Sequence, residues 1–160
     1  MRIEILISNQ TLTLYDDAGG LVARYVVSTA ANGAGCTKDS GCTPQGAHII
    51  RAKIGEGAPS NTVFVARRQT GEICTPVLMA EFPNRDWILT RILWLSGTDI
   101  GKNRLGNVDT MQRYIYIHGT PDSTDMNKVG SHGCIRMRNS DVIALFDMVE
   151  VGTPVIISEL

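Results

Sequence analysis

The sequence has little charge and no excess of either sign. Charged residues make up 19% of the 160 residues, and 15 lysines and arginines oppose 16 aspartates and glutamates. Proteins that bind nucleic acid usually carry a basic surplus that neutralises phosphates, and none is present here. We therefore expect no nucleic-acid partner. The apolar content of 43% also argues against an intrinsically disordered chain.

Long apolar runs are absent as well. Near the start only Ile5 to Ile7 are consecutive apolar residues, and Glu4 precedes them. A secretory signal needs about 7–15 apolar residues before its cleavage site, and a membrane span needs about 18 or more. We therefore expect no membrane association and a cytoplasmic protein, with a periplasmic location as the alternative if a leader has been removed.

Linkers, repeats and low-complexity segments are also missing, which favours one domain over residues 1–160. No Walker, dinucleotide-binding, H-E-x-x-H or G-x-S-x-G motif occurs, and we expect no cofactor. Short stretches of alternating apolar and polar residues, separated by turn residues, indicate many strands. The predicted strands are residues 2–8, 11–15, 21–27, 47–54, 62–66, 87–95, 114–117 and 155–157.

One helix is predicted near the C-terminus. Asn139 or Ser140 is a candidate N-cap, and Gly152 with Pro154 would end the segment. The apolar stripe at helical spacing consists of Val142, Leu145, Phe146 and Val149. The fold class predicted is therefore mostly β with one or two helices, a sandwich or a barrel.

The side chains best suited to catalysis lie in residues 117–137, and they are His118, His132 and Cys134. A cysteine nucleophile needs a base to form the thiolate, a group that orients the base, and donors for the oxyanion. His118 is a candidate base, and the carbonyl of Gly119 could hold its second ring nitrogen. The backbone N–H groups of His132, Gly133 and Cys134 could form the oxyanion hole.

These residues resemble a known signature. His118-Gly119 followed by residues 131–136, S-H-G-C-I-R, resembles the YkuD-type L,D-transpeptidase family. Weaker similarities cover most of the chain, at residues 9–15, 28–29, 43–46 and 151–155. The resemblance implies a β-rich catalytic domain with Cys134 as nucleophile, His118 rather than His132 as base, and Gly119 as its carbonyl partner. It also implies the three oxyanion donors, with Ser131 and Arg136 shaping the substrate site.

The residue pattern adds Tyr116 to the expected substrate-binding residues, because one face of residues 114–117 could line the cleft. The resemblance further implies the substrate, a peptidoglycan stem peptide or muropeptide. The family attacks the bond between diaminopimelate and the terminal D-Ala, forms a thioacyl-enzyme, and passes the acyl group to an amine or to water. For a cytoplasmic protein, water would be the acceptor, so L,D-carboxypeptidase activity in wall recycling is favoured. Cross-linking or D-amino-acid exchange is the alternative, and a non-catalytic peptidoglycan-binding domain is an alternative of another class.

Two further expectations concern the lid and the other cysteines. The interval between His118 and Cys134 is short for the family, which predicts a trimmed loop over residues 120–130. Cys36, Cys42 and Cys74 with His48 invite a zinc site, but their spacing is unlike that of structural zinc ligands. We therefore expect free thiols and no metal. The sequence leaves the oligomeric state open.

Overall fold

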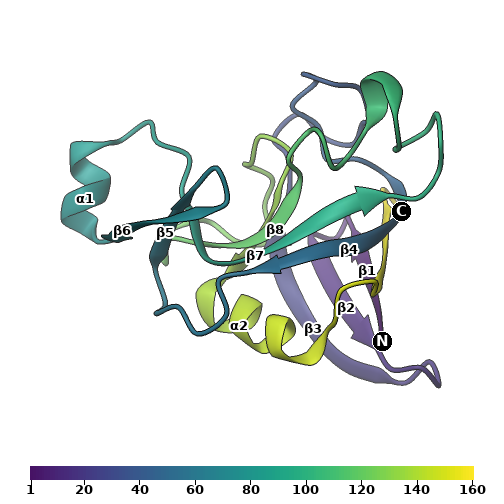
Figure 1. Cartoon of the computed structure of the whole chain (residues 1–160), viewed down its shortest axis with the longest axis horizontal. Coiled ribbons are helices and arrows are strands. Elements are labelled where there is room, and N and C mark those ends of the chain that lie inside the picture. The colour runs from purple at the N-terminus through teal and green to yellow at the C-terminus, as the bar shows by residue number, and fades with distance from the viewer.

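A computed structural model describes all 160 residues and contains ten strands, two α-helices and one 3₁₀ turn (Figure 1). The strands are β1 (Arg2–Leu6), β2 (Thr11–Tyr15), β3 (Leu21–Ser28), β4 (Gly46–Ile54), β5 (Thr62–Val65), β6 (Arg68–Ile73), β7 (Ile88–Gly97), β8 (Tyr116–Thr120), β9 (Ile135–Arg138) and β10 (Pro154–Ser158). The helices are α1 (Pro76–Glu81) and α2 (Asn139–Met148), and the 3₁₀ turn is Gly106–Val108. The expected mostly-β fold is confirmed.

Eight of the strands close into a barrel. Neighbouring strands follow the order β4-β10-β1-β2-β3-β9-β8-β7, and β4 also pairs with β7, so the first and last members of this series meet. The remaining two strands, β5 and β6, form a hairpin attached to β7. In Figure 1 this hairpin and α1 project together to one side of the barrel.

The hydrophobic core fills the barrel and the space under α2. Alternate residues of β1 and β2, Ile3, Ile5, Leu12 and Leu14, are fully buried, as their spacing predicts for strands with one face inward. Val142, Leu145 and Phe146 of α2 belong to the same cluster of 19 buried residues, which joins the helix to the strands. The predicted apolar stripe of the helix is therefore its buried face.

The start of α2 differs from the prediction. The N-cap position is Arg138, whose side chain makes no capping hydrogen bond, and neither Asn139 nor Ser140 caps the helix. Asn139 is instead buried and used in tertiary contacts: its Oδ1 accepts from Thr90 Oγ1 at 2.6 Å and its Nδ2 donates to Asn61 Oδ1 at 2.9 Å. A residue type that often caps helices here connects α2 to β7.

Three elements were not predicted: α1, β6 and β9. The signal for α1 was present, since Thr75 caps it by accepting from the Leu78 N–H and Pro76 occupies its first turn. The predicted strand 114–117 begins later than expected, because Tyr114 has a left-handed φ of 56° and lies outside β8. Neither helix is long and apolar enough to cross a membrane.

Candidate active site

His118 is held in one orientation on β8. It lies between β7 and β9, paired with Ile92 on one side and Arg136 on the other. Its side chain is buried, and its Nδ1 lies 2.6 Å from the carbonyl oxygen of Gly119, so this nitrogen donates and Nε2 is free to accept a proton. Burial lowers the pKa of His118, which favours the neutral ring.

Gly119 sits where three elements meet too closely for a side chain. A Cβ at this position would lie 2.6 Å from the carbonyl oxygen of Leu89 and closer still to Oδ1 of Asn139. The Cβ of Thr90 would be 3.0 Å away. The carbonyl that fixes the His118 ring is therefore positioned by close packing of β7, β8 and α2.

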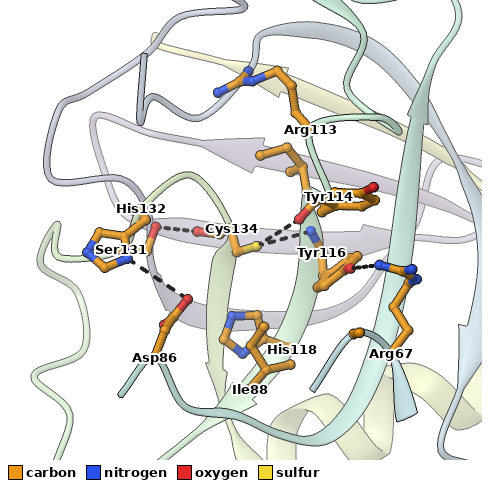
Figure 2. A pocket seen from close by; sticks show the side chains of 12 residues that line it. Arg67, Asp86, Ile88, Arg113, Tyr114, Tyr116, His118, Ser131, His132 and Cys134 are labelled. Carbon is orange, nitrogen blue, oxygen red and sulfur yellow. Dashed lines mark hydrogen bonds and ion pairs between the residues drawn. The ribbon is translucent and has the colours of Figure 1, made fainter. Parts of the chain in front are cut away.

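Cys134 directly precedes β9, and its sulfur faces the backbone of the segment that enters β8. The Sγ atom accepts from the Tyr116 N–H at 3.3 Å and donates to the Tyr114 carbonyl at 3.4 Å (Figure 2). Burial raises the pKa of Cys134 to about 12. The thiol is therefore protonated at neutral pH and needs a base to become a nucleophile.

The residues before Cys134 form a tight turn. Ser131 Oγ donates to the Cys134 carbonyl at 2.6 Å and accepts from the Gly133 N–H at 3.2 Å. Gly133 has a φ of +134°, and Thr43 Oγ1 donates to its carbonyl at 2.9 Å. Of the three expected oxyanion donors, the N–H groups of His132 and Cys134 have no partner in the chain, whereas that of Gly133 is occupied by Ser131.

His118 and Cys134 line one pocket of about 430 Å³. Ser131, His132 and Tyr116 line it as well, so the structure brings most of the predicted site residues together. The His132 side chain is 80% exposed. The loop over residues 120–130 lies outside the residues that line this pocket.

Arg136 is the one predicted substrate-binding residue that does not line this pocket, and the predicted backbone contributors Gly119 and Gly133 also lie outside its lining. Its Nη2 lies 3.7 Å from Oδ1 of Asp86, a pocket residue whose other carboxylate oxygen is 3.9 Å from His132 Nδ1. Instead, two arginines that the sequence did not single out, Arg67 and Arg113, line the pocket on either side of Tyr114 (Figure 2). Neither they nor Asp86 stand in a motif, and they reach the site only through the fold.

The residues weighed as a zinc site do not form one. All four cysteines are free thiols, and no three His, Cys, Asp or Glu side chains gather closely enough to hold a metal. His48 is buried with both ring nitrogens engaged, Nδ1 by the Gly46 carbonyl and Nε2 by Thr110 Oγ1, both at 3.0 Å. Its position is structural.

Comparison with known proteins identifies the same family that the motif around Cys134 resembles. The family model of the YkuD L,D-transpeptidase catalytic domain matches residues 1–157. The Escherichia coli protein named "Probable L,D-transpeptidase YbiS" is 34% identical over 107 residues, which are 64% of this chain and 34% of that protein. Bacillus subtilis YqjB is 46% identical over 43 residues, 27% of this chain and 24% of that protein. The chain thus spans about a third or less of the length of these curated relatives.

Solved structures share the fold at low sequence identity. L,D-transpeptidase 3 from Mycobacterium tuberculosis, in complex with a faropenem-derived adduct, superposes with a TM-score of 0.59 at 17% identity, over 98% of this chain and 59% of that chain. Bd1075 of Bdellovibrio bacteriovorus superposes with a TM-score of 0.59 at 15% identity, over 99% of this chain and 47% of that one.

Proposed function

Because this chain belongs to the YkuD family of L,D-transpeptidase catalytic domains, we propose that it is a cysteine acyl-transfer enzyme acting on peptidoglycan stem peptides. The bond cleaved joins diaminopimelate to the terminal D-Ala, and Cys134 is the nucleophile. One observation carries the proposal: Cys134 and His118 line the same pocket, and His118 is held by the Gly119 carbonyl in the tautomer that can accept a proton.

Acylation begins when the thiol turns from the Tyr114 carbonyl toward His118. His118 Nε2 takes the proton from Sγ, and the thiolate attacks the carbonyl carbon of diaminopimelate. The N–H groups of His132 and Cys134 stabilise the oxyanion, a contribution of about 2.7–4 kcal/mol for each donor. When the C–N bond breaks, the imidazolium returns its proton to the amine of D-Ala, which leaves as the free amino acid.

Deacylation repeats these steps with a second nucleophile. We favour water, which makes the enzyme an L,D-carboxypeptidase that converts tetrapeptides to tripeptides. A pocket of about 430 Å³ is near the small end of the usual range for ligand sites, so one peptide end occupies much of it. Water adds no further bulk. Soluble muropeptides would be the donors if the protein acts in the cytoplasm.

The experiment is incubation of the purified protein with a disaccharide tetrapeptide, with and without an excess of a D-amino acid. Release of D-Ala with tripeptide as the sole product supports hydrolysis. An exchanged tetrapeptide supports the alternative, L,D-transpeptidase activity. Cys134→Ala should release no D-Ala, and Cys74→Ala, which changes a buried thiol outside the pocket, is the matched control.

The alternative of another class is a non-catalytic peptidoglycan-binding domain. It requires the tetrapeptide to bind without a covalent adduct forming at Cys134. Intact-mass spectrometry after rapid acid quenching separates the two, because the acyl-enzyme retains the tripeptide mass and a non-covalent complex does not.

A further inference from the structure

Arg67 is a pocket residue that the steps above do not use. It stands at the tip of the β5–β6 hairpin, and its guanidinium lies 4.8 Å from the ring centres of both Trp94 and Tyr114. Its Nη1 donates to the Tyr116 hydroxyl at 2.9 Å. Two aromatic faces and one hydrogen bond therefore hold the side chain against the pocket. Figure 2 shows the hydrogen bond between Arg67 and Tyr116.

The backbone that places Arg67 there is strained. Ala66 and Arg67 form the two-residue turn between β5 and β6, with left-handed φ values of 48° and 64°. Hairpin turns of this kind strongly favour Asn-Gly, because residues with larger side chains pay a steric cost in that conformation. Strain at a position that delivers a charged group into a pocket is typical of functional sites.

Arg67 also has unused hydrogen-bonding capacity. A guanidinium has five N–H donors, and Arg67 uses one of them within the chain. Arg113, the other arginine of the pocket, already donates to the Gly35 and Cys42 carbonyls and to Ser40 Oγ. No carboxylate of the protein lies within ion-pair distance of Arg67. The group therefore suits a carboxylate supplied by the substrate.

The position of Arg67 indicates which of two donor carboxylates it would bind, the terminal one of D-Ala or the distal one of diaminopimelate. Tyr116 contacts Cys134 Sγ through its backbone N–H and Arg67 through its hydroxyl, so a whole tyrosine side chain separates the two sites. In the donor, only the amide nitrogen and one carbon lie between the reacting carbonyl and the terminal carboxylate of D-Ala. The entire diaminopimelate side chain lies between that carbonyl and the distal carboxylate, which matches the longer separation.

We infer that Arg67 binds the distal side-chain carboxylate of the acyl donor and makes the enzyme selective for donors in which this carboxylate is free. This inference rests on the proposed function. A donor with the distal group amidated, or with lysine in place of diaminopimelate, lacks the anion that Arg67 would bind. Arg67 is thus a specificity-determining residue at the end of the pocket opposite Asp86.

The experiment compares kcat/KM for two tetrapeptides that differ only in whether the distal carboxyl is free or amidated. The wild-type enzyme should prefer the free acid by roughly tenfold or more. Arg67→Gln should lower kcat/KM for the free acid by roughly 10- to 100-fold and leave the amide within about twofold. Arg67→Gly should do the same without a folding defect, since glycine adopts the left-handed turn readily. Arg68→Gln, an exposed change at the next residue, should alter neither.

Two results would overturn the inference. An equal loss on both peptides would make Arg67 a support for Tyr116, and a loss that instead tracks amidation of the terminal carboxyl would assign it to D-Ala. Calorimetric binding of both peptides to Cys134→Ala, with and without Arg67→Gln, gives the same comparison without turnover. If the wild-type protein turns over neither peptide while Cys134→Ala still binds the free acid selectively through Arg67, the proposed reaction is refuted and this inference stands.

Discussion

Replacement of Gly119 by alanine tests whether close packing at the β7–β8–α2 junction positions the imidazole. The added methyl group would lie 2.6 Å from the Leu89 carbonyl oxygen, which belongs to the backbone and cannot rotate away. Relief requires β7 and β8 to separate, which moves the Gly119 carbonyl that holds His118 Nδ1 at 2.6 Å. Overpacking of this kind costs about 1–3 kcal/mol, and the backbone contact places the expected value near the top of that range.

Thermal unfolding and donor turnover measure the two consequences. For a domain of this size, about 2–3 kcal/mol corresponds to a Tm decrease of roughly 4–12 °C. Misplacement of the ring should lower kcat/KM by roughly 10- to 100-fold. The control is Gly130→Ala, whose new methyl group would meet the far end of the Arg136 side chain at 3.3 Å and no backbone atom, so the Tm should be nearly unchanged.

A double mutant refines this test. Asn139→Ala removes the oxygen closest to the new methyl group, but it leaves the Thr90 hydroxyl without its acceptor and Asn61 Oδ1 without its donor, at about 1–3 kcal/mol. The double variant Gly119→Ala with Asn139→Ala should therefore lose less free energy of unfolding than the sum of the two single losses. Because the Leu89 contact remains, the double variant should still be less stable than Asn139→Ala alone. A Gly119→Ala protein that melts and turns over like the wild type would refute the argument.

Three further outcomes are expected. His118→Gln should slow alkylation of Cys134 by iodoacetamide at pH 7–8 to the rate of a buried thiol, because the pKa of Cys134 is raised to about 12. Peptide mass spectrometry measures the labelling, and an unchanged rate would contradict the role of His118 as base. Burial lowers the pKa of His48 from 6.5 to about 4, so the folded state disfavours protonation of this ring. The free energy of unfolding should therefore be highest above pH 6.5 and should fall by on the order of 3 kcal/mol as the pH drops toward 4. Urea titrations should show that the free energy of unfolding of His48→Gln depends less on pH than that of the wild type. Thr43→Val should cost about 1–3 kcal/mol and lower kcat more than it raises KM, because Thr43 Oγ1 bonds the Gly133 carbonyl and the Ala30 N–H; a change confined to KM would contradict this.

Local patterns in the sequence predicted the parts of the fold whose causes are local. The alternation of Ile3, Ile5, Leu12 and Leu14 predicted the first strands, and the residues 131–136 predicted the turn that presents Cys134. In contrast, β9 has four residues, and β6 is largely exposed and polar. Both become strands because a neighbour supplies their backbone hydrogen bonds, which no short window of sequence records.

The pocket shows the same division. His118, Gly119 and Cys134 stand in a recognisable motif, but Arg67 and Asp86 reach the pocket from the β5–β6 hairpin and the segment before β7. The orientation of the thiol toward Tyr114 was equally unpredictable, because it depends on a left-handed residue just before β8. The ion pair between Arg136 and Asp86, a pocket residue, likewise depends on the fold, and the role of Arg136 in substrate binding stays a prediction.

The closure of the barrel bears on how the molecule folds. β1 lies between β2, its neighbour along the chain, and β10, which follows β9 and α2, and β10 also bridges to β4. During synthesis the early strands would therefore leave the ribosome with one edge unsatisfied until β10 emerges. Pairings between such distant segments slow folding, so refolding of this domain should resemble that of slow all-β proteins, on the order of milliseconds to seconds. The turn that carries Cys134, which lies between β8 and β9 in the chain, would form late, when the barrel closes.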